Sequence, residues 1–160
     1  MKPPLYIETS VVSYLTARPS LQIVTAARQH HTRVWWDTRR SRYDLFISPL
    51  VIAEAELGDS SAAAARLEAL RGLEVVAASE ESDALAEALL REVPLPEKAT
   101  ADANHIAVAA VTGAECLLTW NFKHIANPVL REQIADVCRS KGYTSPTLCS
   151  PEDLLAATTP

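Results

Sequence analysis

Short apolar segments alternate along this chain with longer helix-forming stretches, and this alternation limits the accessible folds more than any other feature. Each apolar segment is brief and nearly continuous, which is typical of parallel strands covered on both faces. The intervening stretches are rich in Ala, Leu, Glu and Arg and are long enough to form helical crossovers. We therefore predict an α/β fold, a three-layer α/β/α sandwich around a short central parallel sheet, with strands at 5–7, 45–47, 73–76 and 116–119.

Capping residues and helix breakers indicate where the helices begin and end. Proline after Ser48 suits the first turn of a helix, Ser79 and Ser82 have the spacing of a capping box, and Gly113 ends a helix. A short helix is expected after Ser10, and a longer one over about 20–40. Further helices are expected to begin at Ser48 and at Ser60, to run from Ser79 to Arg91 and over 100–111, and to follow Pro128. An edge strand is expected at 147–148 and a turn at 151–156.

Length and cysteine usage favour one domain over residues 1–160. A chain of 160 residues can bury roughly 70% of its extended surface, so it needs no metal or disulfide to stabilise its core. The three cysteines, Cys116, Cys138 and Cys149, lie far apart without zinc-site spacing, which favours a reducing, cytoplasmic setting. The first apolar run is interrupted at Glu8, and no run approaches a membrane span, so neither secretion nor membrane insertion is expected.

The charge distribution excludes a protein that coats duplex nucleic acid non-specifically, because the net charge is −5. Positive charge is concentrated in residues 28–43, which contain five arginines, one aspartate and the aromatic residues Trp35, Trp36 and Tyr43. This window could contact phosphates and stack on unpaired bases. Alternatively, its tryptophans fill the core or a dimer seam while its arginines are solvated. Consecutive helical residues point about 100° apart, so we expect one tryptophan to face a groove or a partner.

Polar residues after strand ends are candidate site residues, because ligands of parallel α/β sheets bind beyond the carboxyl ends of the strands. Glu8 follows the first strand and Asn121 the fourth, while Glu54 and Asp102 lie on the helices near 48 and 100. If these four side chains converge, their oxygen atoms suit Mg²⁺ or Mn²⁺. Such a cation can generate hydroxide and stabilise charge on a displaced phosphate oxygen.

Simpler explanations exist for some of these acids. Asp102 can be explained as a favourable charge at a helix N-terminus, and Glu54 as a solvated helix charge like Glu56. Glu8 is harder to explain in this way, because a carboxylate at the end of an apolar strand would be partly desolvated without a partner. The joint arrangement therefore supports the metal site more than any single residue does.

Four segments, in order, resemble the motif set of PIN domains, most closely that of VapC-type toxins of toxin–antitoxin systems. They are YIETSVV at 6–12, SPLVIAE at 48–54, ADANHIA at 101–107 and LLTWNFKH at 117–124, and the resemblance extends from residue 5 to about 150. It implies a PIN-like α/β/α sandwich, metal-dependent ribonuclease activity on RNA with Mg²⁺ or Mn²⁺, a homodimer, and a cognate antitoxin that inhibits it.

The resemblance also assigns roles at matching positions. It implies catalytic roles for Glu8, Glu54, Asp102 and Asn121, the first three of which would hold the metal directly or through water. Thr119 matches the family's threonine after the fourth strand, and Thr9 or Ser10 its hydroxyl after the first acid. The positions of Lys123, His124 and His105 in the sequence place them near the same site, although His105 can also be interpreted as a packed helix residue. The candidate substrate contacts are therefore Thr9, Ser10, Thr119, Lys123, His124 and His105.

Two positions depart from the family pattern. Glu8 stands where the family usually has Asp, which lengthens the ligand arm, and Asn121 removes one negative charge. These departures favour one bound cation over a tight pair and predict altered or weakened activity. The alternative is a catalytically weakened PIN-like protein acting as a dimeric binding module. A phosphatase-like enzyme is disfavoured, because Thr9 and Ser10 follow Glu8 in place of a D-x-D pair.

Overall fold

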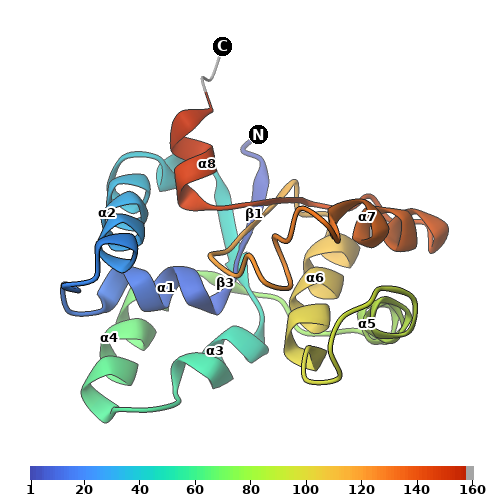
Figure 1. The fold of residues 1–160 in the computed structure, drawn as a ribbon, viewed down its shortest axis with the longest axis horizontal. Coiled ribbons are helices and arrows are strands. Elements are labelled where there is room, and N and C mark those ends of the chain that lie inside the picture. The colour runs from blue at the N-terminus through green and yellow to red at the C-terminus, as the bar shows by residue number, and fades with distance from the viewer. Residues whose placement is uncertain (158–160) are drawn as a thin grey trace.

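A five-stranded parallel sheet in the order β3-β2-β1-β4-β5 forms the centre of this computed structural model, which describes residues 1–157 (Figure 1). The first strand is central, with Tyr6 opposite Phe46 on one side and Leu117 on the other. Because every pair is parallel, all carboxyl ends lie at one edge of the sheet. The strands are β1 (Pro4–Ile7), β2 (Asp44–Ile47), β3 (Glu74–Val75), β4 (Cys116–Leu118) and β5 (Thr147–Cys149).

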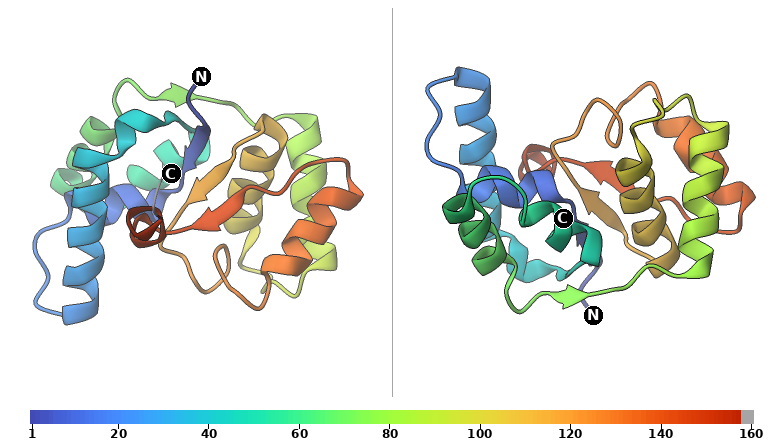
Figure 2. Two further views of the ribbon diagram at one scale, coloured as in Figure 1. Left: turned by 90° about the horizontal axis from the view of Figure 1, so that it is seen from above. Right: turned by 90° about the horizontal axis from the view of Figure 1, so that it is seen from below.

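Helices cover both faces of the sheet, as predicted. One layer contains α1 (Thr9–Thr16), α2 (Ile23–Thr38), α3 (Pro49–Ala55), α4 (Ser60–Leu70) and α8 (Pro151–Ala156), with the short 3₁₀ turn η1 (Arg40–Arg42) after α2. The other contains α5 (Glu80–Glu92), α6 (Thr100–Thr112) and α7 (Arg131–Ser140). Figures 1 and 2 show these two groups on opposite sides of the strands, so the predicted three-layer α/β/α sandwich is confirmed.

The predicted helix signals are partly confirmed. Ser79 and Ser82 form a reciprocal capping box at α5, and Gly113 ends α6 in the left-handed conformation, with φ of 83°, which glycine adopts without a Cβ penalty. The N-cap of α1 is Glu8 and not Ser10, because the longer Glu8 side chain folds back onto the Ser10 backbone N–H. Similarly, α2 begins at Ile23 and not at Ser20.

The C-terminal segment and the strand β3 differ slightly from the prediction. The expected edge strand is present as β5, but residues 151–156 form the helix α8 where a turn was predicted. A capping box between Ser150 and Asp153 explains the helix, because each satisfies a backbone N–H of the other. The strand β3 is shorter than predicted, since only Glu74 and Val75 pair with β2.

Both tryptophans of α2 are buried, with Trp35 0% and Trp36 9% exposed. The expectation that one of them faces a groove or a partner is therefore wrong for this chain. Trp35 packs near Tyr43, while η1 turns back so that the Arg40 guanidinium covers the Trp36 ring at 4.7 Å from its centroid. The three cysteines are free thiols. Among the described residues, none of the helices combines the length and apolar character needed to cross a bilayer.

Candidate metal centre

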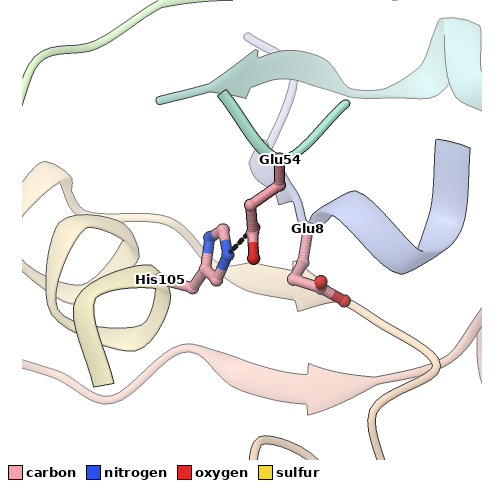
Figure 3. Close-up of side chains that lie close together, drawn as sticks. All are labelled: Glu8, Glu54 and His105. Carbon is pink, nitrogen blue, oxygen red and sulfur yellow. Dashed lines mark hydrogen bonds and ion pairs between the residues drawn. The ribbon is translucent and has the colours of Figure 1, made fainter. Parts of the chain in front are cut away.

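Three side chains from different elements meet at the carboxyl edge of the sheet. Glu8 follows β1, Glu54 lies on α3 and His105 on α6, and one potential ligand atom from each lies within 4.8 Å of the others (Figure 3). We call these three residues the core-linked cluster. The chain crossovers explain the meeting, because β1 and β2 are adjacent strands and α6 leads into β4 on the other side of β1.

Glu8 is buried, at 6% exposure, and both oxygens of its carboxylate accept hydrogen bonds. It accepts hydrogen bonds from the Ser10 backbone N–H at 3.0 Å, the Thr119 hydroxyl at 2.6 Å, and the Ser10 hydroxyl. In Figure 3 the carboxylate turns away from Glu54. The Glu8 carboxylate thus both caps α1 and contacts Thr119, which follows β4.

Glu54 has one occupied and one open oxygen. Its Oε1 lies 2.6 Å from both the Thr9 hydroxyl, which donates to it, and His105 Nε2, whereas Oε2 has no hydrogen-bond donor among residues 1–157. Burial raises the pKa of this carboxyl, but the hydrogen bonds from His105 and Thr9 and the electrostatic interaction with His105 together outweigh burial and lower its pKa. Glu54 is thus held as a carboxylate with a free oxygen.

His105 is 1% exposed and uses both ring nitrogens. Nδ1 lies 2.7 Å from the Tyr6 hydroxyl, which in turn lies 2.8 Å from Ser48 Oγ. Burial raises the pKa of Tyr6 well above its usual range, so its hydroxyl keeps its proton. When Tyr6 donates that proton to Nδ1, the imidazole carries a proton on Nε2 and donates it to Glu54. In this arrangement the hydrogen bond from the buried His105 fixes the orientation of the Glu54 carboxylate.

Asp102 belongs to a second, neighbouring group. Its Oδ1 accepts from Asn121 Nδ2 at 3.0 Å, and its Oδ2 lies 2.6 Å from His124 Nδ1. We call Asp102, Asn121 and His124 the loop-linked cluster, since the last two residues lie in the segment after β4. Thr119 connects the clusters, because its hydroxyl donates to Glu8 and accepts from the Asn121 backbone N–H at 2.9 Å.

The structure thus brings the predicted site residues together in two sets. The expected metal ligands were Glu8, Glu54 and Asp102, but the group with ligand atoms in mutual reach contains His105 in place of Asp102. Of the expected substrate contacts, Thr9, Ser10 and Thr119 bind the carboxylates, His124 binds Asp102, and Lys123 is exposed.

Sequence reasoning missed Tyr6 and Ser48 as parts of the site. Ser48 is the N-cap of α3, yet its side chain bonds the Tyr6 hydroxyl in place of a helix N–H. A signal for Tyr6 was present, because a tyrosine in a fully buried strand needs a partner for its hydroxyl. The identity of that partner depends on α6, 99 residues away in the chain.

The donor set fits a hard divalent cation. Carboxylate oxygens are the ligands that Mg²⁺ and Mn²⁺ prefer, and Glu54 Oε2 is left open in a side chain that is 31% exposed. The hydroxyl and imidazole donors behind Glu8 and Glu54 are the outer contacts that orient ligating carboxylates.

Comparison with protein families identifies the class of protein. Residues 5–127 match the PIN domain family, so the chain belongs to the PIN domain family. No curated protein sequence matches it.

Two solved structures share the fold. VapC20 of Mycobacterium tuberculosis, a toxin that cleaves the sarcin–ricin loop, is 19% identical with a TM-score of 0.54, over 71% of this chain and 86% of VapC20. A chain of VapBC2 from Rickettsia felis, solved bound to a DNA fragment from its promoter, is 17% identical with a TM-score of 0.51, over 79% of this chain and 94% of that one.

Proposed function

We propose that this PIN domain is a divalent-metal-dependent endoribonuclease that acts as a VapC-like toxin. The observation that carries the proposal is the meeting of Glu8, Glu54 and His105 at the carboxyl edge of the sheet, with an open oxygen on Glu54. The family resemblance of the sequence motifs supports RNA as the substrate, and the fold that the chain shares with VapC20 is consistent with it.

Glu54 and Glu8 would hold a Mg²⁺ or Mn²⁺ ion, with Asp102 as a further ligand directly or through water. When bound, the ion supplies a hydroxide nucleophile and stabilises charge on the leaving phosphate oxygen. The chain's own residues prepare these ligands. Thr9 and His105 keep Glu54 ionised, Ser10 and Thr119 fix the Glu8 carboxylate, and Asn121 and His124 fix that of Asp102.

The proposed partners follow from the same family. A cognate antitoxin would inhibit the nuclease, in line with the solved VapBC2 assembly, and the nuclease would act as a homodimer in the cytoplasm. One observation favours a second candidate function, the catalytically weakened dimeric binding module: the Glu8 carboxylate is already supplied with three donors, which compete with a cation. An activity measurement separates the two.

A cleavage assay with a matched pair of variants tests the proposal. End-labelled RNA is incubated with the purified protein in Mn²⁺, in Mg²⁺ and in EDTA. We expect metal-dependent cleavage that falls about 100-fold or more in Glu54→Gln, because losing a residue that only orients a metal ligand already costs about 10- to 100-fold, and Glu54 is proposed to be a ligand itself. Glu56→Gln removes the same charge from an exposed residue two positions away and should cleave normally. Cleavage in EDTA, or full activity of Glu54→Gln, would contradict the proposal, and absence of cleavage by the wild type would favour the binding module.

A further inference from the structure

A guanidinium group and two aromatic rings meet beside the candidate metal centre. The centre of the Arg28 guanidinium lies 5.5 Å from the Trp120 ring centroid and 5.3 Å from that of Phe122. The two rings contact each other edge to face, with centroids 6.0 Å apart. These distances are within the range in which a cation is attracted to an aromatic face. The three side chains therefore form one preorganised unit, which we call the Arg28 platform.

The charge of Arg28 is oriented but not neutralised. Its Nη1 lies 3.4 Å from the Tyr14 hydroxyl, and in the described part of the chain no carboxylate forms an ion pair with it. The backbone beneath it is fixed, because Thr32 donates to the Arg28 carbonyl at 2.6 Å and accepts from the Trp120 indole N–H at 2.7 Å. A fixed, unpaired guanidinium in a chain of net charge −5 is available to an anionic ligand.

The platform adjoins the metal centre through the segment after β4. Trp120 and Phe122 flank Asn121, the residue that donates to Asp102. The Trp120 backbone N–H also donates to Ser10 Oγ at 2.8 Å, and Ser10 in turn binds Glu8. Trp120 is nearly buried, at 4% exposure, whereas Phe122 is 36% exposed. Phe122 therefore offers the accessible ring surface of the platform, one residue from the acidic clusters.

We propose that the Arg28 platform binds an unpaired nucleotide next to the phosphate that is cut, which rests on the proposed nuclease function. The Arg28 guanidinium contacts a backbone phosphate, and the exposed ring of Phe122 stacks on the adjoining base. Base stacking on an aromatic ring requires a base that is free of its duplex neighbours, so the platform selects single-stranded or looped RNA at the cut site. Arg28 also offsets the repulsion between RNA and the carboxylates.

The platform corrects the interpretation of the arginine-rich window. Of the two interpretations of that window, stacking of its tryptophans on bases is wrong, because Trp35 and Trp36 are buried in the core, as the alternative interpretation held. Arg28 is a residue of the window that reaches aromatic rings near the site, and those rings belong to residues 120 and 122.

RNA binding without cleavage tests the platform separately from catalysis. Affinity for a fluorescein-labelled single-stranded RNA and for its duplex is measured by anisotropy in EDTA at several salt concentrations. Phe122→Leu keeps an apolar side chain without a ring and should weaken single-strand binding about 5-fold or more. Arg28→Ala should weaken it about 10-fold and reduce the slope of log K against log salt by about 0.7, the value for one lost contact to a single-stranded phosphate. Arg28→Lys should fall between Arg28→Ala and the wild type.

A matched control exists at the opposite edge of the sheet. Arg40 covers Trp36 in the same type of cation–π contact, but it lies just before β2, away from the strand ends that carry the site. Arg40→Ala should therefore change affinity less than 2-fold, and circular dichroism confirms that each variant is folded. The platform is overturned if Arg28→Ala and Arg40→Ala weaken binding equally, if Phe122→Leu binds normally, if the duplex binds as tightly as the single strand, or if no RNA binds. A protein that binds through the platform but never cuts RNA in Mn²⁺ overturns the nuclease proposal alone.

Discussion

The two polar clusters at the strand ends contain the same pairing, a histidine 2.6 Å from a carboxylate, but are supported differently. In the core-linked cluster, His105 is held by Tyr6, which reaches Ser48, so the hydrogen bonds extend into the middle of the sheet. In the loop-linked cluster, His124 lies in a segment without regular secondary structure and is 19% exposed.

The difference shows that similar local geometry can have different consequences for the whole fold. Removing a partner from a buried polar network costs the desolvation penalty of every group left unpaired, whereas water can replace a partner at an accessible site. The core-linked cluster should therefore couple site chemistry to stability. The loop-linked cluster should be adjustable with less effect on folding.

The largest expected difference is between the two histidine deletions. His105→Ala removes one of the two hydrogen-bond partners of both the Tyr6 hydroxyl and Glu54 and opens a buried space, so the free energy of unfolding should fall by about 3 kcal/mol. His124→Ala should cost about 1 kcal/mol, because solvent reaches Asp102. Urea denaturation of both variants measures the difference, and equal losses would contradict the comparison.

Metal addition tests which cluster binds the cation. Mn²⁺ at about 100 times its dissociation constant should stabilise the wild type by about 2.7 kcal/mol, which calorimetry records as a rise in Tm. The rise should disappear in Glu54→Gln and shrink in Asp102→Asn, because Glu54 carries the open oxygen. An undiminished rise in Tm in Glu54→Gln would contradict binding at Glu54 and favour the loop-linked cluster as the metal site.

Removal of a single oxygen tests the link to the core. Tyr6→Phe leaves Ser48 and His105 without the hydroxyl between them and should cost about 1 to 2 kcal/mol. Tyr143→Phe provides the control, since its hydroxyl forms no hydrogen bond within residues 1–157, and should be nearly neutral. Thermal unfolding distinguishes them, and a neutral Tyr6→Phe would show that the hydroxyl does not connect the site to the core.

The smallest expected effect comes from restoring a charge to the loop-linked cluster. Asn121→Asp replaces a donor 3.0 Å from Asp102 with a like charge, so the metal-free protein should lose about 0.5 to 1 kcal/mol while Mn²⁺ binds more tightly. Gln133→Glu adds the same charge at an exposed position in the first turn of α7, where it should not lower stability and should leave Mn²⁺ affinity unchanged. Titration calorimetry gives both affinities, and weaker Mn²⁺ binding by Asn121→Asp would exclude Asp102 from the metal's surroundings.

Much of the fold was predictable, because apolar segments and capping signals are local in the sequence. The carboxyl-edge location of Glu8 and Asn121 follows from parallel strands, whereas the strand order β3-β2-β1-β4-β5 was not predicted. The division of the site into two clusters was not predictable. Asp102 and His105 lie one turn apart on the same face of α6, and only the packing of α6 against β1 decides that His105 meets Glu54. The covering of Trp36 by Arg40 likewise depends on how η1 turns back onto α2, which is a tertiary feature.

The short strands at the two ends of the sheet limit how a second copy of the chain could associate. The outer strand β3 pairs through only two residues, both exposed, and β5 through three. Edge strands this short present little backbone for an intermolecular sheet, which protects the monomer from edge-to-edge aggregation. Edge-to-edge pairing of two sheets is therefore a poor way to form a homodimer of the proposed kind.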